Sequence, residues 1–279
     1  MSPTRVPFVK MHGLGNDFVV FDGVRRRLKL DAGRVRAIAD RHFGIGCDQV
    51  LLVEPATKPG AHFSYRIFNA DGGEVAQCGN GARCFARFVR EQGLCDADDV
   101  IVDTRAGRMI LHLQPNGDVK VNMGVPRHAP AEIPYQAAAE APLYTLTIDG
   151  TEIRFGAVSL GNPHAVIVVD DVDLAPVATL GRRIESDPAF PERVNVGFLA
   201  PIDRQQGRLR VFERGSGETL ACGSGACAAV IVGIEQGLFD DTVHLDLPGG
   251  RLQVQWSGRG RPAFLIGPAV TVFEGSIDL

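Results

Sequence analysis

The sequence predicts an α/β fold, of the mixed α+β kind, with two pseudo-symmetric domains that derive from an internal duplication. The first observation is a repeat: residues 68–94 align with residues 212–238 at an offset of 144 positions, and 11 of the 27 pairs are identical. The second observation is that strand-like apolar runs precede each of these segments, whereas a helix-like run closes each one. We expect one domain at 1–123 with 268–279 and the other at 124–267.

The repeat extends beyond these two segments. "LGND" at Leu14 corresponds to "LGNP" at Leu160, an offset of 146 positions, and at that same offset Gln49 falls on Asn195. The matched positions are Asn16 with Asn162, Gln49 with Asn195, Asn69 with Glu213, and Cys78 with Cys222. Nearly equal offsets over this much chain indicate duplication of a unit of about 140 residues.

Short apolar runs predict the strands in chain order. They are "FVVFD", "QVLLV", "SYRIF", "MILHL" and "VKVNM" in the first half, then "YTLTI", "HAVIVV", "VNVGFL", "RLRVF" and "LQVQW" in the second. The final run, "AVTVF", could return to pair with the first half. A stretch rich in Pro and Ala, residues 125–142, connects the halves and could belong to either of them.

Two helices are expected at 82–92 and 226–236, because each stretch carries helix-forming or apolar residues and ends at a Gly followed by Leu. The second helix is apolar nearly all round. Such a helix must be buried on every side, which favours strands that curl around it.

Composition limits the classes of function. The chain has 279 residues, of which 45% are hydrophobic and 22% charged, and its net charge is -4. These values describe a soluble globular protein and give no support for a nucleic-acid partner. The N-terminus lacks the apolar core of a signal peptide, and the longest apolar run, 226–234, is about half a membrane span. We therefore expect a cytoplasmic protein with neither a membrane nor a nucleic-acid partner.

The six cysteines do not have the spacing of a metal site. No C-x-x-C pair occurs, so we expect no zinc or other metal centre. Cys84 and Cys227 suit the ordinary interpretation of a small buried hydrophobic residue. Cys78 and Cys222 do not, because glycines crowd both of them just before the expected helices. A helix N-terminus favours an anion, so we expect the pKa of each thiol to lie below its reference of about 8.5.

Two equivalent thiols suggest a pair that acts on one carbon. To invert an amino-acid α-carbon, a base removes the proton on one face while an acid delivers a proton on the other. Helix N-termini can stabilise the charge that moves onto the α-carboxylate. No pyridoxal phosphate signature or nucleotide fingerprint is present, so we expect no cofactor.

Polar residues near the cysteines are candidates for substrate contacts. Glu213 and Arg214 form a charged pair at a strand end, which suits an ammonium and a carboxylate together. His164 is either a core histidine or a group near the substrate ammonium. The amides are Asn16, Gln49, Asn69, Asn162 and Asn195. Each amide could simply be a turn residue, but their pairing across the repeat favours a ligand.

The sequence resembles diaminopimelate epimerase over essentially its full length. The motifs that carry the resemblance are "MHGLGNDFVV", "FNADGGEVAQCGNGARCFARF", "GNPHAV", "VNVGF" and "FERGSGETLACGSGACA". The resemblance implies two α/β domains, each a barrel-like sheet around a central helix. It also implies a pyridoxal-free, two-thiol interconversion of LL- and meso-diaminopimelate in lysine and cell-wall biosynthesis. A homodimer is the expected assembly.

The resemblance also implies a role for each matched residue. Cys78 and Cys222 would be the acid/base pair, and His164 and Glu213 would tune the site. Main-chain N–H groups of Gly79, Asn80, Gly223 and Ser224 would hold the reacting carboxylate. The residues in contact with substrate would be Asn16, Gln49, Asn69, Asn162, Asn195, Glu213 and Arg214.

Two alternatives remain open. A racemase similar to proline racemase uses the same fold logic and paired cysteines on another amino acid, but it would not need Arg214 and several amides to bind a second amino-acid end. A non-enzymatic interpretation is a dithiol redox switch or an amino-acid-binding protein, in which Cys78 and Cys222 form a regulatory disulfide. Racemase activity under reducing conditions would separate these classes.

Overall fold

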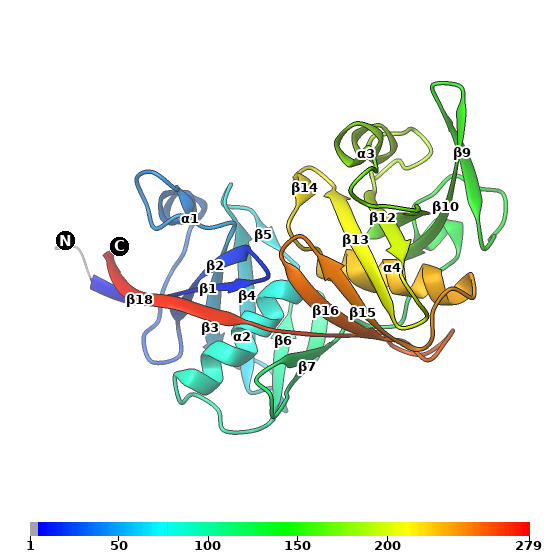
Figure 1. The fold of residues 1–279 in the computed structure, drawn as a ribbon. Coiled ribbons are helices and arrows are strands. Elements are labelled where there is room, and N and C mark those ends of the chain that lie inside the picture. Colours follow the sequence, from blue (N-terminus) through cyan, green and yellow to red (C-terminus); the bar gives the residue numbers. More distant parts are fainter. Residues whose placement is uncertain (1–4, 77) are drawn as a thin grey trace. The chain divides into compact units, whose positions relative to one another are not determined.

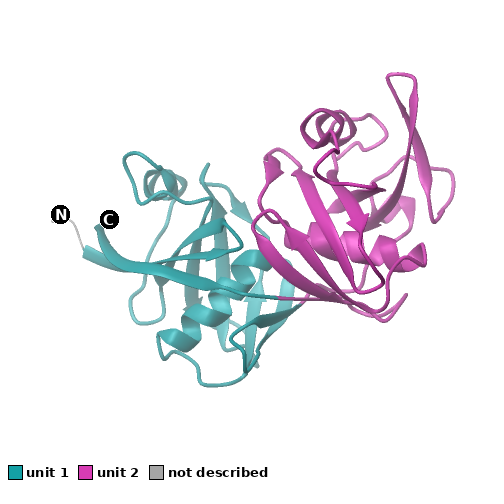
Figure 2. Ribbon diagram, viewed as in Figure 1, with its two compact units in different colours: residues 1–121, 267–279 teal, residues 122–266 magenta. Residues whose placement is uncertain are grey.

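The computed structural model describes residues 5–76 and 78–279. Gln77, which precedes the first cysteine, therefore lies outside the described residues. The chain divides into two compact units, Met1–Val121 with Gly267–Leu279 and Asn122–Ile266 (Figure 2). The assignment of one epimerase half to 1–123 with 268–279 and of the other to 124–267 stays a prediction.

The first unit is a mixed sheet with two helices. Its strands pair in the order β18–β1–β2–β3–β4–β6–β7–β8, and the β2–β3 and β4–β6 pairs are parallel. The helices are α1 (Ala32–Ala39) and α2 (Gly79–Glu91). The strands are β1 (Arg5–Gly13), β2 (Asn16–Asp22), β3 (Gln49–Pro55), β4 (Phe63–Asn69), β5 (Glu74–Val75), β6 (Asp99–Thr104), β7 (Gly107–Leu113), β8 (Val119–Asn122) and β18 (Val270–Asp278) (Figure 1).

The second unit repeats this topology. Its strands pair in the order β9–β10–β11–β12–β13–β15–β16–β17, and the β11–β12 and β13–β15 pairs are again the parallel ones. The helices are η1 (Pro130–Glu132), α3 (Val177–Glu185) and α4 (Gly223–Glu235). The strands are β9 (Tyr144–Ile148), β10 (Thr151–Ser159), β11 (Pro163–Val168), β12 (Asn195–Pro201), β13 (Gln206–Glu213), β14 (Gly217–Thr219), β15 (Thr242–Leu247), β16 (Gly250–Gln255) and β17 (Phe264–Gly267).

Each unit wraps its sheet around one helix. Helix α2 packs against β1, β2, β3, β7 and β18, whereas α4 packs against β10, β11, β12, β13 and β16. Most residues of both helices are buried. The approach is close: a Cβ on Gly156 of β10 would lie 2.4 Å from Val232 Cγ1 of α4. The predicted fold class, a barrel-like mixed sheet around a central helix in each half, is confirmed.

Each predicted strand overlaps an observed one, and the last strand pairs with the first half as expected, because β18 runs antiparallel to β1. The two predicted helices begin three residues too late, since the observed helices start directly after the cysteines, at Gly79 and Gly223. The connector 125–142 contributes Ile133 and Tyr135 to the core of the second unit, where Tyr135 stacks on Phe190 with ring centroids 4.7 Å apart. The connector therefore belongs to that unit.

Among the described residues, no helix combines the length and the apolar character that crossing a bilayer requires.

Candidate active site

Cys78 is the N-cap of α2. Its sulfur accepts a hydrogen bond from the Gly81 N–H at 3.5 Å, and Asn16 Oδ1 lies 3.8 Å from the same sulfur. Asn16 Oδ1 also accepts from Asn80 Nδ2 at 3.2 Å. Strand β2 thus places an amide at the start of α2, so Asn16, Cys78 and Asn80 form one cluster.

Cys222 is the N-cap of α4, and its main-chain contact matches that of Cys78. Its sulfur accepts from the Gly225 N–H at 3.4 Å and lies 3.7 Å from Ser224 Oγ. Asn162 Nδ2 donates to Ser224 Oγ at 3.2 Å, and Asn162 Oδ1 lies 3.2 Å from His164 Nε2. A continuous chain of polar contacts therefore runs from His164 to the thiol.

Both helices have glycine at the third helical position, where neighbouring atoms leave little room for a side chain. A Cβ on Gly225 would lie 3.2 Å from the Cys222 sulfur, and a Cβ on Gly81 would lie 2.5 Å from the Tyr65 hydroxyl oxygen. The cysteine side chain caps the third N–H of each helix, and the first N–H groups have no intrahelical acceptor because no helical turn precedes them. Such a helix start can hold a carboxylate, which is the arrangement expected for Gly79, Asn80, Gly223 and Ser224.

Gln49 and Asn69 lie next to each other in the first unit. They are Cα partners across the β3–β4 ladder, and Gln49 Nε2 donates to Asn69 Oδ1 at 2.8 Å. The Gln49 Oε1 atom is buried and has no hydrogen-bond partner among the described residues. An acceptor in that position suits an ammonium donor.

Both ends of the Asn195 side-chain amide form hydrogen bonds with main-chain groups. Its Nδ2 donates to the Pro163 carbonyl at 3.1 Å, and its Oδ1 accepts from the Arg214 N–H at 2.9 Å. Arg214 Nη1 in turn donates to the Glu192 carbonyl at 2.8 Å. The structure therefore gives Asn195 a role that the sequence did not predict, which is to hold the turn that carries Arg214.

Burial decides the protonation of two groups in the second unit. Burial, followed by the charge and the hydrogen bond of the Glu213 carboxylate, raises the pKa of the Cys222 thiol well above its ordinary value. The expectation that the helix N-terminus lowers this pKa is wrong, because the N–H bond from Gly225 is a smaller effect than desolvation. Burial and the Arg214 charge lower the pKa of His164 to about 3, so the imidazole is neutral.

Three residues that contact the candidate site residues or their turns were not predicted from the sequence. Asp48 accepts from Asn16 Nδ2 at 2.9 Å, Thr219 Oγ1 donates to Glu213 Oε1 at 2.5 Å, and buried Glu185 accepts from the Gly215 N–H at 2.9 Å. Asp48 stands directly before Gln49, and that adjacency was the one signal in the sequence that could have indicated it.

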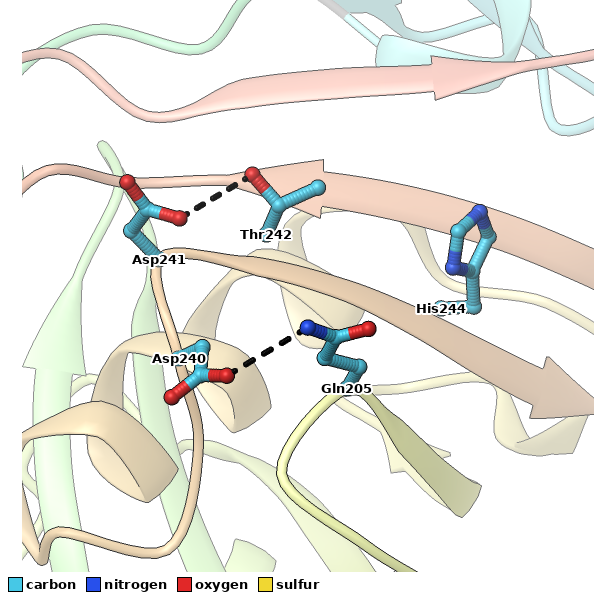
Figure 3. Close-up of a pocket in the computed structure, with 5 residues that line it drawn as sticks. All are labelled: Gln205, Asp240, Asp241, Thr242 and His244. Atoms are coloured by element: carbon cyan, nitrogen blue, oxygen red, sulfur yellow. Dashed lines mark hydrogen bonds between the residues drawn. The ribbon is translucent and has the colours of Figure 1, made fainter.

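A surface pocket of about 470 Å³ lies elsewhere in the second unit. Gln205, Asp240, Asp241, Thr242 and His244 line it, and Gln205 Nε2 donates to Asp240 Oδ2 at 3.5 Å (Figure 3). Four of these residues come after the C-terminal end of α4 in the chain, whereas Cys222 caps the N-terminal end of the same helix. The pocket is therefore separate from the thiol.

The profile of the diaminopimelate epimerase family matches residues 8–129 and 156–272. This chain belongs to the diaminopimelate epimerase family. The diaminopimelate epimerase of Nitrosomonas eutropha is 57% identical over 278 residues, which cover 99% of this chain and 100% of that protein. The diaminopimelate epimerase of an Azoarcus species is 56% identical, with 98% of this chain and 99% of that protein covered.

Solved structures with low sequence identity share the fold of this diaminopimelate epimerase family member. A hydroxyproline epimerase from Agrobacterium vitis superposes with a TM-score of 0.70 at 17% identity, covering 99% of this chain and 92% of that one. A phenazine biosynthesis protein of the PhzF family from Bacillus anthracis gives a TM-score of 0.71 at 17% identity, covering 99% and 100%. These two likenesses concern the fold alone.

Proposed function

We propose that this protein is a pyridoxal-independent epimerase that interconverts LL- and meso-diaminopimelate with two cysteines as acid and base. Membership of the diaminopimelate epimerase family supports the substrate. The observation that carries the mechanism is that Cys78 and Cys222 are N-caps of equivalent helices in two units of the same topology. No other pair of cysteines in the described chain has this placement.

In this mechanism one thiolate removes the α-proton, and the other thiol adds a proton to the opposite face of the carbon. The electron pair of the broken C–H bond moves into the α-carboxylate and returns to the carbon when the new C–H bond forms. Main-chain N–H groups at Gly79, Asn80, Gly223 and Ser224 hold the carboxylate and stabilise its added charge. The raised pKa of Cys222 supports its resting form as the proton donor.

The remaining residues select the substrate. Diaminopimelate has a second amino-acid end, and Arg214 suits its carboxylate because a guanidinium can bind two oxygens at once. Asn195 would act through the Arg214 turn, which it already holds, and His164 and Glu213 would tune the Cys222 side. The amides in contact with substrate would be Asn16, Gln49, Asn69 and Asn162.

We also propose where and in what assembly the enzyme acts. It would act without a cofactor, as a cytoplasmic homodimer, in the synthesis of lysine and of peptidoglycan precursors. The names of the relatives support the diaminopimelate step.

Exchange of the α-proton in heavy water tests this function. LL-diaminopimelate incubated with the reduced enzyme should gain deuterium at the inverted α-carbon, because the incoming proton derives from a thiol that exchanges with solvent. Mass spectrometry after chiral separation would measure the label. Epimerisation without uptake of deuterium, or no turnover of diaminopimelate at all, would contradict the proposal.

A further inference from the structure

Asn16 and Asn162 occupy equivalent positions, but their amides point in opposite senses. In the first unit the oxygen of Asn16 is the atom near the thiol and Asn80 Nδ2, while its nitrogen donates to Asp48. In the second unit the nitrogen of Asn162 donates to Ser224 and the oxygen lies against His164 Nε2. Asn16 therefore turns its oxygen toward Cys78, whereas Asn162 turns its nitrogen toward Ser224, the residue whose hydroxyl lies against Cys222.

The partner of each amide accounts for its orientation. An ionised carboxylate can only accept hydrogen bonds, so Asp48 requires the NH₂ group of Asn16 and leaves the oxygen for Cys78. At the offset of 146, the position of Asp48 is taken by Val194 in the second unit, and that of His164 by Phe18 in the first. Each unit thus has one orienting partner and lacks the other.

Asp48 is itself held in place. Its Oδ2 accepts from the Asp17 N–H at 3.1 Å as well as from Asn16, and its Oδ1 accepts from Arg41 Nη2 at 2.7 Å. Its own N–H donates to Asp17 Oδ1 at 2.8 Å. Lys10 Nζ and Arg41 both pair with the Asp17 carboxylate, at 2.6 and 2.8 Å. The carboxylate therefore presents a fixed acceptor to Asn16.

We infer that Asp48 is a positioning residue, which fixes the Asn16 carbonyl toward Cys78 so that this thiol meets a hydrogen-bond acceptor. An acceptor binds the S–H form and not the thiolate, so it favours and orients the proton that Cys78 carries. Cys222 has a hydroxyl in the place of this amide oxygen, since Ser224 Oγ, which accepts from Asn162, lies 3.7 Å from its sulfur. The inference rests on the proposed function and assigns this proton control to a residue outside the substrate contacts.

The rate at which iodoacetamide alkylates Cys78 tests the inference, because the thiolate is the reactive form. Cys78 is partly exposed, so the reagent reaches it, and peptide mass spectrometry separates it from Cys222. In Asp48→Ala, Asn16 can turn its NH₂ group toward the sulfur, where it stabilises the thiolate. The alkylation rate of Cys78 at neutral pH should therefore rise about threefold to tenfold, which corresponds to one hydrogen bond. Cys222 should react at its wild-type rate.

Asp48→Asn is the matched control, because it removes the charge but keeps an oxygen that can accept from Asn16. The alkylation rate of Cys78 in this variant should lie within about twofold of the wild-type rate, a smaller change than the loss of one hydrogen bond would cause. Arg41→Gln, which removes the ion pair and leaves the acceptor, should behave likewise. Equal increases in Asp48→Ala and Asp48→Asn would show a charge effect and overturn the inference, as would no increase in Asp48→Ala.

Folding and function are checked separately. If Asp48→Ala does not fold, Asp48→Ser takes its place, since its hydroxyl is too short to reach Asn16, and the same increase is expected. The alkylation needs no substrate. Failure of deuterium uptake by the wild-type enzyme would therefore remove the proposed function, while the alkylation rates would still decide what Asp48 does.

Discussion

The two cysteine sites have the same backbone arrangement but differ in the polar groups around the thiol. Cys222 lies beside the Glu213 carboxylate and is linked through Ser224 and Asn162 to the neutral His164, whereas the sulfur of Cys78 lies against the Asn16 amide and the Gly81 N–H. The substitutions between the units follow this division, because Asn69 corresponds to Glu213 and Phe18 to His164. Duplication kept the helix caps and the strand register, and divergence placed a carboxylate beside the thiol of Cys222 where the first unit has the amide Asn69.

Replacement of either cysteine by serine should have the largest effect on activity. A hydroxyl is a far poorer acid or base than a thiol, so Cys78→Ser and Cys222→Ser should each lose epimerisation by at least about 10²- to 10⁴-fold. Each variant keeps one thiol, however. With a substrate that carries a β-halogen, removal of the α-proton alone suffices for elimination of halide.

The two variants should therefore eliminate halide from opposite stereoisomers, each from the isomer whose α-proton its remaining cysteine can remove. Chiral chromatography of the unreacted substrate would measure the preference. The double variant should do neither reaction while its circular dichroism stays native. Equal elimination from both isomers by one variant would favour a single base with a mobile intermediate.

Arg214→Lys should weaken the binding of substrate in the second unit. Lysine cannot copy a bidentate guanidinium contact, so KM for diaminopimelate should rise about tenfold to a hundredfold with a smaller change in kcat. Initial rates over a range of substrate concentrations would show it. Arg251→Lys is a control, because that guanidinium also makes a two-point contact with a carboxylate, Asp246, but lies in the β15–β16 hairpin and outside the proposed site. An unchanged KM in Arg214→Lys would remove the residue from the site.

Glu213→Gln should make the second site resemble the first. Loss of the carboxylate removes a negative charge from beside Cys222, so the pKa of its thiol falls and its alkylation at neutral pH should rise about tenfold. The reciprocal change, Asn69→Asp, should slow the alkylation of Cys78. If Glu213→Gln leaves Cys222 as unreactive as before, then burial alone controls this thiol.

The sequence predicted the topology better than the local chemistry. The repeat and the apolar runs located the strands, and the all-apolar "ACAAVIVGI" required a sheet around it. The helix starts were placed too late because glycines have low helix propensity, and the cysteine caps outweighed that preference. The wrong direction for the Cys222 pKa has the same origin: burial and the approach of Glu213 depend on tertiary structure, as does the contact of Asp48 with Asn16 across the β2–β3 register.

The smallest expected effect is on stability: the buried thiol of Cys222 should make the free energy of unfolding depend on pH under alkaline conditions. The pKa of Cys222 is raised in the folded state, mainly by burial, so the unfolded chain loses this proton first as pH rises through about 8.5. The unfolded state then binds fewer protons than the folded one, and the free energy of unfolding falls with rising pH. Below that pH the contribution is fully present.

One such group lowers the free energy of unfolding by about 1.4 kcal/mol for each pH unit above its unfolded pKa, until the folded pKa is reached. Cys47 and Cys84 add to the total, because burial also raises the pKa of each to about 12. The difference between wild type and Cys222→Ser isolates the one thiol. Urea unfolding under reducing conditions would give the free energy of unfolding of both proteins as a function of pH, and the two curves should diverge only above about pH 8.5. Curves that stay parallel would mean that Cys222 is not buried as a thiol in the folded protein.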